Sequence, residues 1–248
     1  MEITSTNNEL IKNYAKLQHK KYRNETGEFL LEGYKAIKEA YDCGVEINRI
    51  FVDKKCIKEY DFAKNLIIET NCVVLKKLAS TESAPPAVAI AKQKRYDIHD
   101  FKNLKKVILL ENIKDLGNLG TIIRSSVAFG CDGIVLYGNC ADIYNPKCVR
   151  SSVGNLWKIP IVKIENFEKL KLIFNNFSKI STLPKSTNYL KNFKITLPAL
   201  LMFGSEADGL SEELKELATD SVKIEMKDNV ESLNLASSAS VIMYELFT

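Results

Sequence analysis

Short apolar runs of strand length recur through the second half of the chain and limit what it can fold into. They include Val107–Leu110, Gly133–Tyr137 and Leu200–Phe203. Continuous apolar runs of this length are typical of parallel strands that are buried on both faces of a sheet. Helical segments such as Ile122–Phe129 separate them, and this alternation favours an α/β fold. No run approaches the roughly 20 apolar residues that span a bilayer, so we expect a cytoplasmic protein without membrane contact.

The first half of the chain alternates in the same way but is more polar. The predicted elements are a helix over 5–20, a strand over 29–31, a helix over 34–43, a strand over 47–52, a helix over 56–70, and strands over 72–75 and 87–91. The charged stretch Lys92–Lys105 then interrupts the pattern. We therefore divide the chain into a first α/β domain over 1–95, a linker over 96–105 and a second domain over 106–248.

Cysteine, histidine and glycine patterns exclude several classes of site. The six cysteines contain no C-x-x-C pair, and the two histidines, His19 and His99, lie in charged segments, so a zinc site is not expected. The chain has no G-x-G and no G-x-x-x-x-G-K-[ST] pattern, which excludes the dinucleotide-binding fingerprint and the P-loop. A nicotinamide-dependent oxidoreductase is therefore excluded as well.

Positive charge is concentrated near the start of the chain, although the net charge is only +4. Lys12, Lys16 and Lys20 would share one face of the predicted opening helix, because they are spaced at i, i+4 and i+8. This face is either an ordinary solvated surface or a surface that contacts phosphates, and the pattern leaves both open.

Three polar loops follow apolar strands in the second half, at Glu111–Gly120, Gly204–Gly209 and Asp228–Asn234. Ligands of open parallel sheets bind at the carboxyl ends of the strands. Gly120 permits a close backbone approach near a helix start, and Arg124 follows one turn later. Arg124 is either a salt-bridged surface residue or a group that faces a phosphate or a reacting hydroxyl.

These loops carry a resemblance to a known family. The order N-x-G-T-I-x-R with A-F-G, then G-S-E-x-x-G-L-S, then E-S-L-N before a small-residue helix resembles the three motifs of the SpoU/TrmH family of RNA ribose 2′-O-methyltransferases. The segment Tyr144–Gly154 also resembles the family, so the match covers residues 106–248. The first half resembles, more weakly, the small ribosomal-protein-like domain with which some members hold RNA.

The resemblance implies a trefoil-knotted α/β fold of the SPOUT type and S-adenosylmethionine as the cofactor. It implies that Gly204, Ile224 and Leu233 contact this cofactor. Arg124 corresponds to the arginine proposed as the base, assisted by an RNA phosphate. Because a guanidinium normally stays protonated, stabilisation of the developing alkoxide is the safer role.

The same resemblance assigns supporting roles to three polar residues. Asn118 would orient Arg124 or the ribose, Glu206 would order the loops, and Asn234 would fix the third loop, opposite Asn118. Three positions depart from the family motifs: Leu116 replaces a proline, Ala207 replaces a glycine, and Asp228 replaces a glycine in a motif that also lacks its proline.

The implied reaction is methylation of a ribose 2′-hydroxyl in structured RNA, with ribosomal RNA favoured and transfer RNA open. The alternatives are a non-catalytic RNA-binding module on the same fold and a knotted enzyme that methylates bases. A homodimer without metal is expected, with Ala236, Ala239 and Ser240 of the last helix at the contact between two copies and with Val241 and Met243 adding apolar area.

Overall fold

The computed structural model describes residues 1–227, 229–230 and 232–248. The chain forms two compact units, each with its own sheet. The first unit comprises Met1–Lys94 and Asp142–Trp157, and the second comprises Arg95–Ala141 and Lys158–Thr248. Asp228, which departs from the family motif, and Glu231, which begins the E-S-L-N motif, lie outside the described residues.

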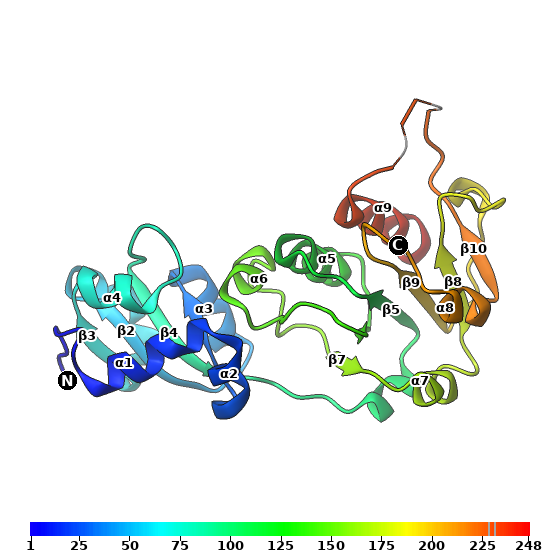
Figure 1. The fold of residues 1–248 in the computed structure, drawn as a ribbon. Helices are drawn as coiled ribbons and strands as arrows, with labels where there is room; N and C mark the ends of the chain where they lie inside the picture. The colour runs from blue at the N-terminus through cyan, green and yellow to red at the C-terminus, as the bar shows by residue number, and fades with distance from the viewer. Residues whose placement is uncertain (228, 231) are drawn as a thin grey trace. The chain divides into compact units, whose positions relative to one another are not determined.

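The first unit has a mixed sheet, with the described strands in the order β1-β4-β2-β3 (Figure 1). Only the β2–β3 pair in this sheet is parallel. The strands are β1 (Glu28–Glu32), β2 (Ile47–Asp53), β3 (Ile67–Thr70) and β4 (Ala87–Lys92). The helices are α1 (Glu9–Ala15), α2 (Lys20–Thr26), α3 (Tyr34–Asp42), α4 (Cys72–Leu78) and α6 (Pro146–Ser151), with 3₁₀ helices η1 (Lys16–Gln18) and η2 (Lys54–Leu66).

One face of this sheet is covered by α1 and α4. Ile11 of α1 and Leu75 of α4 are fully buried in one apolar cluster with Phe51 of β2. Side chains alternate between the two faces of a strand, so Ile50 and Val52, the neighbours of Phe51, point to the other face. The sheet is therefore buried on both sides, in agreement with the unbroken burial of Ala87–Ala91 in β4.

Three sequence predictions for this unit are wrong. The predicted helix over 56–70 ends at Leu66 as a 3₁₀ helix, and Ile67–Thr70 form the strand β3. The predicted helix over 5–20 is broken, because His19 is extended (φ −101°, ψ 134°) between η1 and α2. Lys12, Lys16 and Lys20 therefore do not share one continuous helix face. The predicted strand over 72–75 is instead the start of α4, since the side chain of Asn71 caps the helix by accepting from the backbone N–H of Val74 at 3.0 Å.

Residues 142–157 pack with the first unit, although the sequence analysis places them in the second domain. The buried guanidinium of Arg23 in α2 donates to Oδ2 of Asp142 through Nε (2.9 Å) and Nη2 (2.6 Å). The Tyr144 ring packs on that of Phe29 in β1, with centroids 4.7 Å apart. A buried ion pair and an aromatic contact thus hold this segment on β1 and α2.

The stretch 96–105 also differs from the expected linker. It contains the 3₁₀ helix η3 (Ile98–Asn103), whose Ile98 and Phe101 are buried in the core of the second unit. Polar residues surround these two apolar ones in the sequence. The composition of the stretch is therefore polar overall and gives no sign of the two buried side chains.

The second unit is built on a sheet whose described strands run in the order β10-β8-β9-β5-β6-β7, with every neighbouring pair parallel. This confirms the predicted α/β fold with a parallel sheet. The strands are β5 (Lys106–Glu111), β6 (Gly133–Tyr137), β7 (Ile161–Ile164), β8 (Ser178–Thr182), β9 (Ala199–Phe203) and β10 (Asp220–Val222). The helices are α5 (Leu116–Ala128), α7 (Phe167–Ile173), α8 (Glu212–Leu217) and α9 (Leu235–Phe247), with the 3₁₀ helices η3 and η4 (Leu190–Asn192).

Packing in this unit brings the three predicted motif loops to one edge of the sheet. The central strand β5 pairs with β9, and both strands end in a motif loop. Helices α5 and α9 pack side by side, and Ser125 and Ser240 share a hydrogen bond of 2.7 Å between their hydroxyls (Figure 1). None of the described helices combines the length and the apolar character that a bilayer-spanning segment needs.

The Arg23–Asp142 pair gives a test of how strongly the 142–157 segment is held. Replacing Asp142 with Asn leaves a buried guanidinium without its counter-charge, so we expect a loss of about 3–5 kcal/mol in the free energy of unfolding, measured in urea. Asp42→Asn is the matched control, because Asp42 pairs with Lys38 at the surface and its loss costs less than about 1 kcal/mol. Equal losses in the two variants would contradict the importance of the buried pair.

Candidate functional site

A cavity of about 810 Å³ lies at the carboxyl edge of the parallel sheet of the second unit. Its wall is formed by the loop after β8, by the loop after β9, by the segment after β10 and by the start of α9. The three residues predicted to contact a cofactor, Gly204, Ile224 and Leu233, all line it. The apolar side chains of the wall include Phe203, Leu210, Met226 and Ile242, and its carboxylates belong to Glu206 and Asp208.

The loop after β9 turns tightly, and Gly204 is required for this turn. Ser205 and Gly209 exchange two backbone hydrogen bonds of 3.1 Å, which close the loop on itself. A Cβ on Gly204 would lie 2.0 Å from the carbonyl carbon of Gly209, closer than any real contact. The loop can therefore close against Gly209 and Leu210 at this end of the cavity only because position 204 has no side chain.

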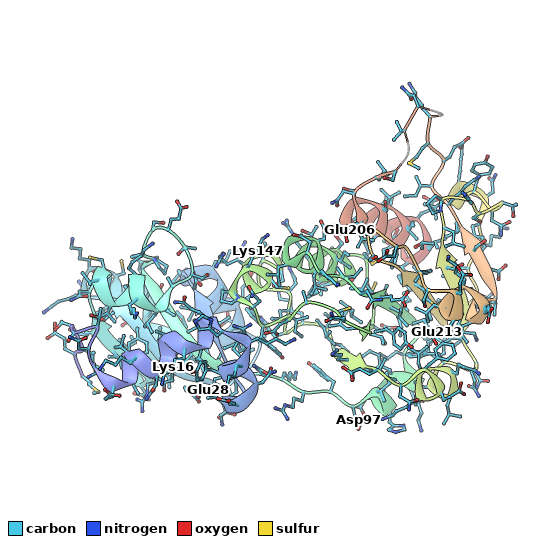
Figure 2. The ribbon with its side chains drawn as sticks, in the orientation of Figure 1. Lys16, Glu28, Asp97, Lys147, Glu206 and Glu213 are labelled. Carbon is cyan, nitrogen blue, oxygen red and sulfur yellow. The ribbon has the colours of Figure 1, made fainter. Side chains whose placement is uncertain are left out.

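Asn118 joins the three motif loops through its side chain. Its Nδ2 donates to Oε1 of Glu206, and its Oδ1 accepts from Nδ2 of Asn234 at 3.1 Å. Glu206 comes from the loop after β9 and lies next to α9 (Figure 2), while Asn234 caps the N-terminus of α9. The arrangement with Asn234 opposite Asn118, predicted from the sequence, is confirmed.

Two departures from the family motifs leave the local structure intact. Leu116 stands at the first position of α5, where proline is favourable but not required, and Asp115 starts the helix by accepting from the N–H of Asn118 at 2.7 Å. Among the described residues, positive φ occurs outside glycine only at Asn112 and Val153. Ala207 therefore does not occupy a conformation that demands glycine.

Arg124 lies on α5, and its side chain is exposed. It makes no hydrogen bond or ion pair with any residue that the structure describes, so the salt-bridged alternative finds no support there. The structure thus brings Asn118, Glu206 and Asn234 together but does not join Arg124 to them. An exposed guanidinium without a carboxylate partner is available to an anionic ligand.

Sequence reasoning missed two residues that hold the loop after β9 in place. Glu111, buried at the end of β5, accepts from the backbone N–H of Ser211 at 2.8 Å. The Tyr137 hydroxyl donates to Glu213 of α8 at 2.5 Å (Figure 2). Burial, followed by this hydrogen bond, raises the pKa of Tyr137, so the hydroxyl stays a donor. The sequence signal that could have identified Glu111 is its position as an acidic residue at the end of an apolar strand.

Among the residues that the structure describes, no group of three or more His, Cys, Asp or Glu side chains is placed to hold a metal ion.

The steric role of Gly204 can be tested by adding one methyl group. Gly204→Ala forces the 204–209 turn away from its position, so we expect affinity for S-adenosylmethionine, the cofactor implied by the resemblance, to fall at least about tenfold in calorimetric titration. Ala207→Gly is the control, since position 207 is exposed and lies in the same turn. An unchanged affinity in Gly204→Ala would show that this turn does not contact the cofactor.

Comparisons with known proteins agree with this geometry. Residues 105–244 match the SpoU rRNA Methylase family, and residues 8–89 match the MRM3-like substrate binding domain. The chain is 30% identical to the 23S rRNA (uridine(2479)-2′-O)-methyltransferase of Streptomyces viridochromogenes, over 98% of this chain and 90% of that protein. It is 28% identical to the 23S rRNA (guanosine(2553)-2′-O)-methyltransferase of Bacillus subtilis, over 99% and 98%.

A solved structure is similar along the whole chain. The AdoMet-bound rRNA methyltransferase of Sinorhizobium meliloti superposes with a TM-score of 0.89, at 28% identity, over 99% of this chain and 96% of that one. The family match covers more than half of the sequence and includes all three motif loops, of which the second and third line the cavity. The chain belongs to the SpoU rRNA Methylase family.

Proposed function

We propose that this chain transfers the methyl group of S-adenosylmethionine to the 2′-hydroxyl of a ribose in ribosomal RNA. The observation that carries the proposal is the Asn118–Glu206–Asn234 connection beside a cavity lined by the second and third motif loops. Family membership supports it, as do the relatives named as 23S rRNA 2′-O-methyltransferases and the AdoMet-bound neighbour.

The cavity suits this cofactor in size and in chemistry. The cofactor supplies an electrophilic methyl group on a positively charged sulfur. The apolar walls formed by Phe203, Leu210 and Ile242 fit an adenine ring, and the carboxylates of Glu206 and Asp208 complement a cation. Backbone contacts are assigned to Gly204, Ile224 and Leu233, which line the same cavity.

Arg124 is assigned to the reacting hydroxyl. A ribose hydroxyl is a poor nucleophile, and negative charge develops on its oxygen as the proton leaves. The exposed guanidinium stays protonated and would stabilise this charge while it holds an adjacent RNA phosphate. Asn118, Glu206 and Asn234 act as positioning residues, because their hydrogen bonds fix the three loops relative to one another.

Removing the guanidinium tests the assignment. Arg124→Ala should lower kcat for methyl transfer to ribosomal RNA at least about 100-fold, as expected for losing a donor to a developing oxyanion. The affinity for S-adenosylmethionine should stay within threefold, since Arg124 does not line the cavity. Lys114→Ala is the control, because it removes an exposed cation from the first motif loop. Near-normal turnover of Arg124→Ala would remove Arg124 from the chemistry.

The target RNA can be identified by mapping 2′-O-methyl groups in cellular RNA. We assign RNA binding to the first unit. If 2′-O-methyl groups are missing from ribosomal RNA in cells without this protein, the proposal is supported. Missing groups only in transfer RNA would favour the alternative substrate. An unchanged map together with RNA binding would favour the non-catalytic module. A cytoplasmic location stays a prediction.

A trefoil knot and a homodimer complete the proposal. Family membership supports a knot in which the last helix is threaded through an earlier loop. For the dimer, Ala236, Ala239 and Met243 are buried inside their own unit, so the prediction that they lie at the contact is wrong, whereas Val241 of the same prediction is exposed. The apolar surface that remains on α9 is Val241 and Tyr244, whose exposed fractions are 43% and 59%. We place the interface there, with about 2,000 Å² or more buried in total.

Light scattering tests this surface. The wild type should have the mass of two chains at micromolar concentration, and the double variant Val241→Glu/Tyr244→Glu the mass of one, because two carboxylates per chain would be buried at the contact. Leu172→Glu places a charge on an apolar residue that is 70% exposed on α7 and should leave the dimer intact. A monomeric wild type would exclude the homodimer.

A further inference from the structure

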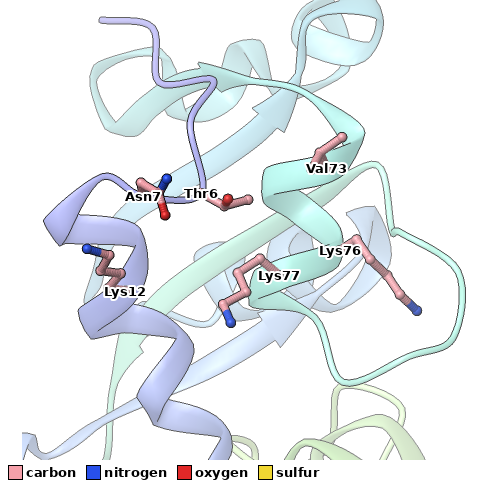
Figure 3. A pocket seen from close by; sticks show the side chains of 6 residues that line it. All are labelled: Thr6, Asn7, Lys12, Val73, Lys76 and Lys77. Carbon is pink, nitrogen blue, oxygen red and sulfur yellow. The ribbon is translucent and has the colours of Figure 1, made fainter.

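The first unit carries a positively charged seam between α1 and α4, which the proposed active site does not use. A groove of about 450 Å³ runs along it, lined by Thr6, Asn7, Lys12, Val73, Lys76 and Lys77 (Figure 3). In the figure, Lys77 points from α4 toward α1, and Thr6 points from the segment before α1 toward α4. The groove is therefore formed by both helices rather than by one solvated face.

The two helices run in the same direction, which gathers lysines at one end of the seam. Near their starts, Nδ2 of Asn71 donates to the carbonyl of Thr4 at 3.0 Å. Near their ends, Nε2 of Gln18 donates to the carbonyls of Lys77, Leu78 and Ala79. Lys16, two residues before Gln18, therefore lies near the same end of the seam as Lys77.

The charge of this seam is poorly compensated. Lys12 pairs with Glu9, which is 80% exposed. The ammonium of Lys16 donates to the neutral Asn13 and lies over the Tyr22 ring, so neither partner neutralises it. The ammonium of Lys76 donates to the carbonyls of Thr81 and Glu82, which hold it without neutralising it. The side-chain ammonium of Lys77 has no hydrogen bond or ion pair with the residues that the structure describes.

We propose that this seam binds the phosphate backbone of the RNA substrate. The proposal rests on the function proposed above, because it places the same RNA on the first unit. Lysine ammonium groups contact phosphates as point charges. The lining has no aromatic side chain on which a base could stack and is otherwise made of Thr, Asn and Val. The seam therefore positions RNA without reading its sequence.

The η2 segment supplies a matched control. Its lysines include Lys55, Lys58 and Lys64, and acidic residues lie among them, with Lys64 paired to Asp61. The buried Tyr60 of η2 contacts Tyr34 of α3, away from the cluster formed with α1 and α4. Each set of three lysines contains one exposed ion pair, so the two triple variants remove equal charge from different surfaces.

The experiment uses the full-length chain and two RNA transcripts of equal length, one from 23S rRNA and one unrelated. Lys12→Gln/Lys16→Gln/Lys77→Gln should bind both transcripts about ten- to fifty-fold more weakly at low salt, with the slope of log affinity against log salt reduced by about 2–3. Lys55→Gln/Lys58→Gln/Lys64→Gln should stay within twofold of wild type. Thermal unfolding and S-adenosylmethionine affinity should match wild type in both.

Three results would overturn the proposal: an unchanged RNA affinity in the seam variant, an equal loss in both triple variants, or a loss confined to one transcript. Methyl transfer separates this inference from the proposed function. The seam variant should raise KM for RNA while kcat at saturating RNA is kept. If the wild type transfers no methyl group but the binding results hold, the proposed function fails and the seam remains an RNA-binding surface.

Discussion

The side-chain amide of Asn118 connects the three motif loops of the second unit through its hydrogen bonds, and a ligand site in this unit depends on that connection. An amide offers a donor and an acceptor at once, and here these reach loops that are 88 and 116 residues further along the chain. A carboxylate in the same place could not donate to Glu206, and an ammonium could not accept from Asn234. The connection therefore requires asparagine or a side chain with the same pair of groups.

The parallel arrangement of the strands explains why few side-chain contacts are needed to bring the motif loops together. Because β5 and β9 are neighbours and parallel, their carboxyl ends emerge together, and the chain needs no further device to bring the motif loops to one place. Buried polar contacts, Glu111 to Ser211 and Tyr137 to Glu213, then fix α8 and the loop that precedes it. The loop after β9 is thus held by Glu111 and by α8 in addition to the Asn118 connection.

The fold class and the proximity of the motif loops could be predicted from the sequence, because buried parallel strands are continuous apolar runs and the motifs follow them. The local secondary structure was harder to predict from the sequence. Cys72–Leu75 is apolar and β-branched like a strand, yet the Asn71 cap makes it helical. Spacing alone could not show that the backbone breaks at His19, and the placement of 142–157 depends on a charge pair between residues 119 apart. Such long-range contacts leave no periodic signal.

The position of Asp142 has a consequence for synthesis of the chain. The sheet of the first unit is complete once Lys92 has been added, but the counter-charge of the buried Arg23 comes 50 residues later. During translation, the guanidinium must stay hydrated, or α2 must stay undocked, until residues 142–157 emerge. The amino-terminal unit therefore finishes folding only after β5, α5 and β6 of the second unit have left the ribosome, and neither unit corresponds to one continuous stretch of the gene.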